Sequence, residues 1–487
     1  MRTGVAHPLD AFFAPRSVVV VGASSTPGKP GNVVVRNILA NGFRGELHLV
    51  NPRADRIEGI QARATLDELP DGIDQAIVTL PAAQTPATVR ALGARGIRAV
   101  VLAASGFAEV DQMGAALQAD LGRAIREAGV RVIGPNTTGH VSTPAGFTSS
   151  FFPLGRVPRG SVSYVAQTGN FCGISLRHIT SAEPFGVARS VGLGNKVDLD
   201  ESDMLDYLGD DPETRSIFLY LESIARPREF LRIARRVSRV KPVILLKGGA
   251  SEAGAAAALA HTGALAGDGR VVDGALAQAG VTRIHRYSSL FHVARALDAV
   301  GLPRGNRVSF LSPSGAFTVC LTDLCRAIGL EVPPLEPRTL ARLQALAPSF
   351  IRMRNPVDIF GSVGLHGYER AYGDALDAVL ADRCVDAVVV ILMLTSETGV
   401  PSFDFLVERA RRQPAKPVLV TFMGEHGHNV AAKAWLEARG VPCYMQVEEP
   451  FEVLAVLARC RARVRATAAG REGEDARQPS AIRSNSS

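Results

Sequence analysis

The sequence lacks several features that would place it in a membrane, outside the cell or around a metal. It has no run of about 20 apolar residues, so we expect no transmembrane helix and no membrane partner. The first 15 residues have neither a long apolar core nor a small-residue cleavage site, so we expect no secretion signal. The six cysteines are scattered and form no CxxC pair, which favours reduced thiols over disulfides or a metal cluster. These absences predict a cytoplasmic protein without a metal site.

The chain also lacks the marks of a nucleic-acid-binding protein, although its net charge is +7. Much of that excess is peripheral, because from Arg461 onward six arginines stand against three acidic residues. No basic run carries interleaved aromatic residues, and we find no nucleic-acid-binding motif. We therefore expect no nucleic-acid partner. A mildly basic surface serves equally well to attract polyanionic small molecules.

What the sequence does contain is enough apolar material for about three domains. It has 487 residues, of which 46% are hydrophobic, and this length is too great for one core. Over residues 8–142, β-branched and apolar runs alternate with helical segments. Such a rhythm predicts a doubly wound parallel sheet, whose ligands bind at the carboxyl ends of its strands. We expect strands within residues 17–24, 46–50, 75–81, 99–102 and 130–136.

The first expected strand runs into a glycine loop whose spacing is not that of a typical NAD site. Gly22 and Gly28 are separated by five residues, which departs from GxGxxG. The second strand ends at Asn51 and Arg53, where an NAD site has an acidic residue. Together with Lys29 in the glycine loop, this suits a ligand that carries an additional phosphate. Coenzyme A and NADP both meet that description, and a nucleotide fold without a ligand is the third reading.

A second domain is expected over residues 156–300. The strand Ser161–Ala166 runs into Gln167, Thr168 and Gly169, where we expect a helix to begin. Unpaired amides and a positive dipole make such a helix start an anion site, although Thr168 also suits a simple cap. Glu222 directly follows five apolar strand residues, so it is either a site residue at a strand end or an ordinary loop glutamate.

The strand Pro242–Leu246 then leads into the small-residue stretch Lys247–Asp268. Glycine, alanine and serine dominate it, so another backbone or a ligand can approach closely. Its only side chain that can act as a nucleophile and proton acceptor near neutral pH is His261. Close packing of a helix on a sheet would explain the small residues as well, and many histidines have no chemical role.

A third domain is expected over residues 305–462, and it repeats the pattern of the second. A strand over residues 308–311 runs into Ser314, Gly315 and Ala316, a second helix start of the same kind. His426 and His428 have no third ligand nearby, so we interpret them as part of an ordinary loop. Residues 466–487 are poor in aliphatic side chains, and we expect them to be disordered.

Eight motifs, in this order, resemble the α subunit or α-like half of the NDP-forming acyl-CoA synthetases, relatives of succinyl-CoA synthetase. The resemblance runs from about Leu9 to Ala458. It implies an α/β fold of three consecutive doubly wound domains, a Rossmann-like CoA-binding domain followed by two flavodoxin-like domains. The motifs are VVVVGAS (18–24), VNP (50–52), GF-x-E (106–109), GPN (134–136), QTGN (167–170), LYLES (219–223), HTGALAG (261–267) and NPVDI (355–359).

The resemblance also implies roles for individual residues. The equivalent of His261 is phosphorylated during turnover in that family, and the equivalent of Glu222 hydrogen-bonds its imidazole. The phosphate is held at the two helix starts by Gln167, Thr168, Gly169, Ser314, Gly315 and Ala316, although an alanine at 316 replaces a glycine of the family pattern. Coenzyme A is held by the first domain, for which we expect contacts from Gly22, Ala23, Ser24, Gly28, Lys29, Asn51, Pro52, Arg53, Pro81, Ser105, Gly106, Phe107 and Asn136.

The implied activity is that of an acid–CoA ligase. Acyl-CoA and phosphate give an acyl phosphate, His261 takes the phosphoryl group, and ADP receives it. The chain has no recognisable ATP-grasp domain and no P-loop, so we expect ATP or ADP with Mg²⁺ on a separate ATP-grasp β subunit in a hetero-oligomer. The alternatives are a CoA-binding regulatory or scaffold protein without turnover and, less compatible with the glycine spacing, an NADP-dependent oxidoreductase. The acyl group of the small carboxylic acid substrate is not specified by any motif.

Overall fold

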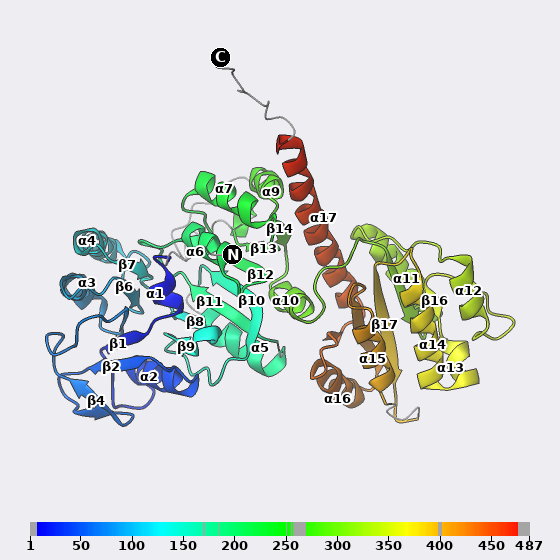
Figure 1. The fold of residues 1–487 in the computed structure, drawn as a ribbon, viewed down its shortest axis with the longest axis horizontal. Coiled ribbons are helices and arrows are strands. Elements are labelled where there is room, and N and C mark those ends of the chain that lie inside the picture. The colour runs from blue at the N-terminus through cyan, green and yellow to red at the C-terminus, as the bar shows by residue number, and fades with distance from the viewer. Residues whose placement is uncertain are drawn as a thin grey trace, which may run out of the picture. The chain divides into compact units, whose positions relative to one another are not determined.

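The computed structural model describes residues 7–168, 171–183, 185–249, 251–254, 256, 269–397 and 402–475. The chain divides into two compact units (Figure 1). One unit comprises Met1–Val237, Val243–Ala279 and Arg283–Ala294, and the other comprises Ser238–Pro242, Gly280–Thr282 and Arg295–Ser487. Three mainly parallel sheets form their cores, which confirms the predicted α/β class with three sheet domains. No helix within the described ranges is long and apolar enough to cross a membrane.

The first sheet has the strand order β3-β4-β2-β1-β5-β6-β7. All neighbouring strands of this sheet are parallel, except that β3 and β4 are antiparallel. The strand β1 lies at the centre of the sheet, and all five residues of β1 are buried. A run of valines is typical of a strand covered on both faces. The strands are β1 (Ser17–Val21), β2 (Glu46–Val50), β3 (Arg56–Ile57), β4 (Ile60–Arg63), β5 (Gln75–Val78), β6 (Ala99–Leu102) and β7 (Arg131–Ile133).

Local signals explain where the helices of this domain begin and end. The helix α2 (Pro30–Ala40) begins with a proline in its first turn, where a missing N–H costs nothing. The helix α4 (Gln112–Ala128) is capped by Asp111, whose carboxylate accepts from Gly114 N at 2.8 Å, and it ends at Gly129 with a φ of 61°. The domain also contains α1 (Asp10–Phe13) and α3 (Thr85–Ala94).

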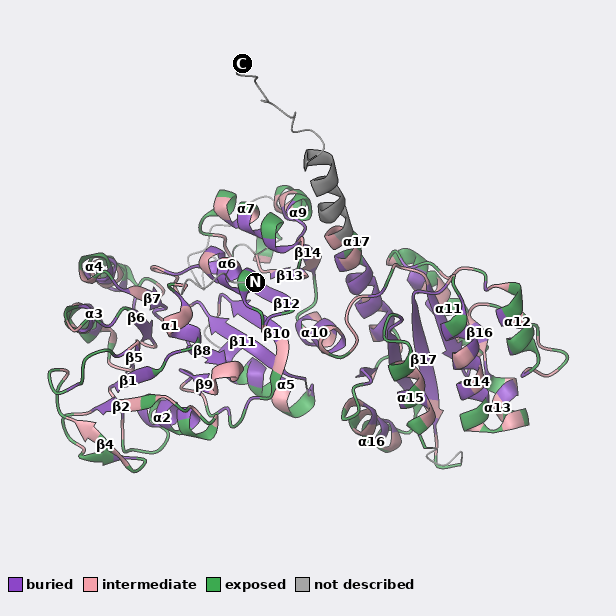
Figure 2. Ribbon diagram, in the orientation of Figure 1, coloured by how far each residue is buried: buried purple, intermediate pink, exposed green. Residues whose placement is uncertain are grey.

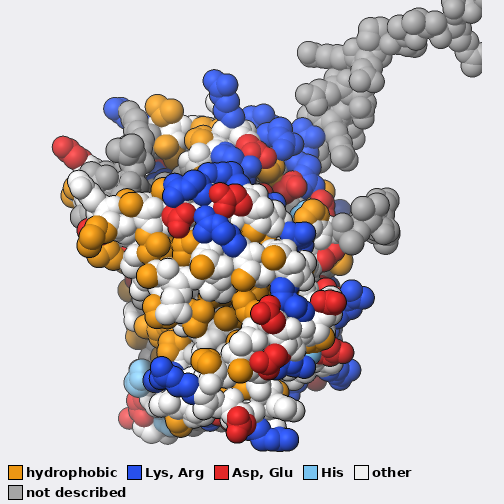
Figure 3. All heavy atoms as spheres, turned by 90° about the vertical axis from the view of Figure 1, so that its left-hand side faces the viewer, with side chains coloured by type: hydrophobic (Ala, Val, Ile, Leu, Met, Phe, Trp, Pro, Cys, Tyr) orange, Lys and Arg blue, Asp and Glu red, His pale blue; other side chains and the backbone are white. Residues whose placement is uncertain are grey.

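Basic and acidic side chains lie among each other on the face drawn in Figure 3. Arg90 of α3 pairs with Asp120 and Glu127 of α4 at 3.1 and 2.8 Å. These exposed pairs connect the two outer helices, and each is worth little free energy in water.

The second sheet has the order β14-β13-β12-β10-β11-β8-β9. Its centre is parallel, but β8 and β9 form an antiparallel hairpin at its edge. The sequence predicts no strand between residues 136 and 161, so this hairpin is an addition to the prediction. Strands of two or three residues are too short to show a period, and the turn between them closes at Gly146 with a φ of 59°. The strands are β8 (His140–Ser142), β9 (Phe147–Thr148), β10 (Arg159–Ala166), β11 (Val187–Gly192), β12 (Ser216–Leu221), β13 (Val243–Lys247) and β14 (Thr282–Ile284).

The helices of this domain include one irregular segment, the π-helical turn η3 (Phe171–Ser175), in which Cys172 departs from helical backbone angles. It leads into α5 (Leu176–Ala182). The other helices are α6 (Glu201–Asp210), α7 (Pro227–Val237), α9 (Gly269–Gln278) and α10 (Ser289–Ala299).

The third sheet is parallel throughout, in the order β16-β15-β17-β18-β19. Its central strand β17 is buried along nearly its whole length, as the purple arrow in Figure 2 shows. The strands are β15 (Val308–Ser312), β16 (Val357–Asp358), β17 (Ala387–Leu394), β18 (Val418–Gly424) and β19 (Cys443–Tyr444). The helices are α11 (Gly315–Ala327), α12 (Pro337–Gln344), α13 (Phe360–His366), α14 (Tyr368–Ala381), α15 (Asp404–Arg412), α16 (His426–Glu437) and α17 (Glu449–Asp475).

Two predictions for this domain were wrong. His426 and His428 open the helix α16 instead of lying in a loop, because the alanine-rich residues after them favour a helix. The predicted disordered tail began at residue 466, yet α17 continues to Asp475. Alanine, arginine and glutamate are strong helix formers, and extending an existing helix avoids the cost of nucleation. Residues 476–487 lie outside the described part of the chain.

Candidate functional site

Three neighbouring parallel strands of the second sheet end in polar residues that contact one another. Gln167 follows β10, Glu222 follows β12, and Lys247 is the last residue of β13. The carboxamide oxygen of Gln167 accepts from the backbone amides of Glu222 and Ser223 at 3.0 and 2.8 Å. Its Nε2 donates to Ser223 Oγ at 3.0 Å. Gln167 therefore fixes the backbone on which the predicted catalytic glutamate stands.

The carboxylate of Glu222 is 7% exposed and lies in a narrow space. Tyr220 donates its hydroxyl to Glu222 Oε1 at 3.0 Å. Burial raises the pKa of Tyr220, and the neighbouring carboxylate raises it further, so the phenol remains a donor near neutral pH. On the other side lies Gly248, where a Cβ would come within 3.2 Å of Glu222 Cγ. A glycine at 248 thus permits the close approach of the two strand ends.

Two lysines that we did not predict hold the turn after β12. Lys247 Nζ donates to the backbone carbonyls of Glu222 and Gly248 at 2.6 and 2.5 Å. Lys196 Nζ donates to the carbonyl and the hydroxyl of Ser223, both at 3.1 Å. Lys196 also pairs with Glu201 at 3.0 Å, and the two side chains are 6% and 0% exposed. The one available signal was the position of Lys247 at the end of a buried strand, whereas Lys196 lies four residues after β11.

Two of the predicted site residues, His261 and Gly169, lie outside the described residues, so their placement stays a prediction. Thr168 is described and directly follows Gln167 at the end of β10. The described chain then resumes in the π-helical turn η3. The helix expected after Thr168 is therefore present in an irregular form.

The predicted anion site of the third domain is a regular helix start. Ser314 is the residue before α11 and has an extended backbone, with φ −147° and ψ 128°. Its side chain makes no capping hydrogen bond. Ser312 Oγ donates to Ser314 O at 2.8 Å and shapes the turn. Gly315 and Ala316 are exposed, so the amides of the first turn face an open surface.

The glycine loop of the first domain is built for close backbone approach. Gly22 follows β1 with a φ of 87°, and a Cβ on Gly31 would come within 2.1 Å of Gly22 O. The first turn of α2 is thereby packed directly on the loop. Gly28 has a φ of 83°, and a Cβ there would meet no atom within 4 Å, while Lys29 precedes α2 without forming a side-chain cap. Ser24 Oγ accepts from Thr26 N at 3.1 Å.

Both polar atoms of the Asn51 side chain make hydrogen bonds within the protein. Its Nδ2 donates to Ala23 O at 2.6 Å, and its Oδ1 accepts from Arg53 N at 2.7 Å. The residue therefore ties the end of β2 to the glycine loop, with Pro52 between the two anchored positions. The side chain of Arg53 is exposed, and Pro81 directly precedes the 3-10 turn Ala82–Gln84.

A hydrogen-bonded chain connects the strand ends of the first sheet to Lys196. Glu109 Oε1 accepts from the amides of Gly106 and Phe107 at 2.7 and 3.2 Å, next to the exposed Ser105. Glu109 Oε2 accepts from Asn195 at 2.6 Å. Burial raises the pKa of Glu109, but these hydrogen bonds outweigh it and lower the pKa overall. Asn136 donates to the same Asn195 at 3.2 Å, so the predicted CoA loops and the Glu222 turn are joined through residues 195–196.

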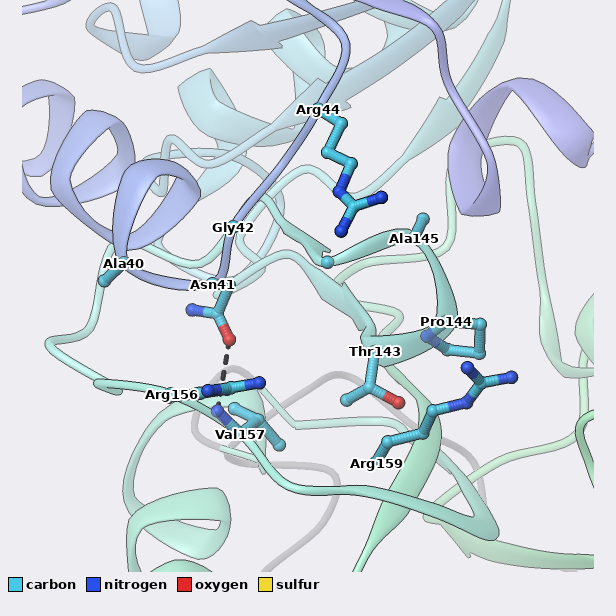
Figure 4. Close-up of a pocket in the computed structure, with 11 residues that line it drawn as sticks. Ala40, Asn41, Gly42, Arg44, Thr143, Pro144, Ala145, Arg156, Val157 and Arg159 are labelled. Carbon is cyan, nitrogen blue, oxygen red and sulfur yellow. Dashed lines mark hydrogen bonds between the residues drawn. The ribbon is translucent and has the colours of Figure 1, made fainter.

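A cavity of about 600 Å³ lies at the other end of α2 (Figure 4). Arg44, Arg156 and Arg159 line it, and none of the predicted site residues does. It is thus separate from the strand-end site. Among the described residues, no group of three or more His, Cys, Asp or Glu side chains could hold a metal ion.

Two known domain families match parts of the chain. A CoA binding domain family matches residues 16–143, and a succinyl-CoA ligase like flavodoxin domain family matches residues 159–297. The α subunit of acetate–CoA ligase (ADP-forming) I from Pyrococcus furiosus is 33% identical over 92% of this chain and 97% of its own length. Acetate–CoA ligase (ADP-forming) II from Archaeoglobus fulgidus is also 33% identical, and this chain spans 65% of that longer protein.

A solved structure gives the same result for the fold. The dinucleotide-forming acetyl-coenzyme A synthetase 1 of Ca. Korarchaeum cryptofilum, in complex with phosphate and ADP, superposes with a TM-score of 0.86 at 30% identity. The match covers 95% of this chain and 98% of that one.

Proposed function

Because this chain belongs to the α-like part of the NDP-forming acyl-CoA synthetases, we propose that it is the α subunit of an ADP-forming acid–CoA ligase. It interconverts acyl-CoA, phosphate and ADP with a carboxylic acid, CoA and ATP. The observation that carries this proposal is the Glu222 carboxylate, which is buried at the carboxyl edge of the second sheet and accepts from Tyr220, on a turn whose backbone Gln167 holds. A regulatory protein without turnover would not need a buried carboxylate held in this way.

The first step takes place on the CoA thioester. A phosphate oxygen attacks the carbonyl carbon, the C–S bond breaks, and CoA leaves while an acyl phosphate forms. A site for CoA fits the first domain, since the turn at Gly22 and Gly31 leaves no room for side chains and lets phosphate groups reach the backbone. Lys29 and Arg53 stand at the same edge of the sheet and would hold the negative charge of CoA.

The second step transfers the phosphoryl group to His261. An imidazole nitrogen attacks phosphorus, the bond to the acyl oxygen breaks, and the carboxylic acid is released. Glu222 accepts a hydrogen bond from the other ring nitrogen and stabilises the positive ring that forms. Phosphoryl transfer needs mainly positioning and charge stabilisation, which the helix starts at Gln167–Thr168–Gly169 and Ser314–Gly315–Ala316 would supply.

The third step requires ADP with Mg²⁺, for which we propose a partner ATP-grasp β subunit. The sequence carries no P-loop, and two of the relatives are themselves named α subunits. An oxygen of ADP then attacks the phosphorus held by His261, and the N–P bond breaks. We therefore propose a hetero-oligomer as the active form. The relatives named above act on acetate, and a small carboxylic acid is the substrate class that we propose for this chain.

The proposal is tested by ATP formation. The chain, co-expressed with an ATP-grasp β subunit, is incubated with acetyl-CoA, phosphate and ADP, and ATP is measured with luciferase. We expect ATP from the pair and none from either subunit by itself. A panel of other acyl-CoA thioesters then defines the acid. A pair that binds CoA but forms no ATP with any thioester would support the regulatory alternative and contradict the proposal.

A further inference from the structure

Lys247 has no role in the chemistry described above, although its ammonium group contacts the turn that carries Glu222. It is the last residue of β13, and its Nζ reaches the backbone carbonyls of Glu222 and Gly248 at 2.6 and 2.5 Å. We propose that Lys247 is a positioning residue, which holds Glu222 in the place that phosphoryl transfer to His261 requires; this inference rests on the proposed function.

The lysine extends the pairing of β12 and β13 beyond the end of the sheet. The register places Leu221 opposite Lys247, and Gly248 N donates to Leu221 O at 2.9 Å. That bond is the last backbone link between the two strands before Glu222. The ammonium group then bridges the next carbonyls on both sides, because it carries three donors on a flexible stem. The turn that carries Glu222 is thereby fixed to the end of β13.

Both carbonyls matter because Glu222 lies against Gly248. A Cβ on Gly248 would come within 3.2 Å of Glu222 Cγ and within 3.4 Å of the Tyr220 hydroxyl. The backbone of Gly248 therefore forms one wall beside the Glu222 side chain. A side chain that bonds this wall and the carbonyl of Glu222 sets the distance between them. Without the ammonium group, both carbonyls lose a charged donor, and the side-chain link between the strand ends beyond Leu221 is lost.

The position is an expensive one for a cation. Burial lowers the pKa of Lys247, and the nearby Arg283 and Lys196 lower it further, whereas Glu222 raises it. A neutral apolar side chain of similar length would avoid this cost. Lys196 anchors Ser223 in the same manner, but Lys247 is the lysine that contacts the backbone of Glu222 itself.

The test separates the two chemical steps in the full α chain with its partner subunit. The first step is followed as phosphate-dependent release of CoA from acetyl-CoA, which precedes any use of His261. The second step is followed as transfer of labelled phosphate from acetyl phosphate to the protein. We expect Lys247→Met to slow the second step about 10- to 100-fold, as misplaced supporting groups do, and to leave the first within about threefold. Lys247→Arg, which keeps charged donors, should lose less.

Two controls make the result decisive. Arg232→Met removes a cation from the surface of α7, where the side chain is 68% exposed, and should leave both steps unchanged. Glu222→Gln tests the proposed function separately, because normal labelling of that variant would contradict the role of the glutamate. Should Glu222→Gln lose labelling while Lys247→Met keeps it, the inference about Lys247 fails and the proposed function stands. Equal losses in both steps for Lys247→Met would show a merely structural role. If Lys247→Met does not fold, Lys247→Arg is compared with the wild type, and a loss in the second step alone supports the inference whereas equal losses in both steps contradict it.

Discussion

The second and third sheets carry helix starts of the same sequence type but surround them differently. At the second sheet, Gln167, Lys196 and Lys247 converge on the turn at Glu222–Ser223, and the described chain resumes after Thr168 in the π-helical turn η3. At the third sheet, a serine turn leads directly into a regular helix, α11, without a capping side chain. Charged groups that fix one another suit a residue that must be oriented, whereas an open helix start suits an anion that arrives and leaves. We therefore expect the second sheet to orient Glu222 in addition to binding phosphate, and the third sheet to contribute phosphate binding alone.

The largest expected effect is on stability, when the buried ion pair between Lys196 and Glu201 is broken. Lys196→Met leaves Glu201 fully buried without its cation, which should destabilise the second domain by about 3–5 kcal/mol. The matched change at the third sheet, Ser312→Ala, removes two neutral hydrogen bonds to Ser314 and no charge, and it should cost about 1 kcal/mol. Hydrogen exchange of peptides from β11–α6 and from β15–α11 measures both. Equal costs would erase the contrast between the two sheets.

Acid should weaken the two regions unequally. His140 of β8 is fully buried, and this burial lowers the pKa of its imidazole to about 4. The nearby charge of Arg189 also lowers the pKa, whereas the hydrogen bond to Phe12 O raises it. Since the unfolded chain takes up this proton near pH 6.5 and the folded chain only near pH 4, stability falls as the pH drops through that window. The loss amounts to about 3 kcal/mol at pH 4.

The control for this prediction is His140→Gln, which cannot titrate. Urea unfolding of the wild type should approach that of the variant as the pH is lowered from 7 to 4. A constant difference between them would contradict the prediction. The three histidines of the third domain, His366, His426 and His428, are not buried, so peptides from that domain serve as the comparison in hydrogen exchange.

The smallest expected effect concerns the open helix start. Ala316→Asp places a carboxylate in the first turn of α11, where it should stabilise the helix by about 0.5 kcal/mol. The same charge repels phosphate, so we expect the KM for phosphate to rise about tenfold. Ala316→Ser is the neutral control. The variant should therefore unfold at a higher temperature but need more phosphate for the same rate. An unchanged KM would exclude α11 from phosphate binding.

The contrast between the sheets was only partly predictable from the sequence. Long apolar strands such as β1 and β17 are evident from composition, and Glu222 and Ser314 from their place after such strands. The hairpin β8–β9 was missed because two or three residues show no period. The Lys247 contacts were missed because they depend on the register of β12 against β13, which the local sequence does not specify. Those of Lys196 were missed because they depend on where the loop after β11 lies. Asn51 was expected to meet a ligand, but its turn-forming bonds became evident only once the neighbouring loop was placed.

The central claim is that phosphate passes through His261 with the help of Glu222, and one labelling experiment tests it directly. The α chain and its β subunit are incubated with γ-labelled ATP, and the protein is then treated with acid or with base. We predict a label that is lost in acid, persists in base, maps to His261 by mass spectrometry and falls at least 100-fold in Glu222→Gln. A label that remains in His261→Ala, or an unchanged label in Glu222→Gln, would contradict the account.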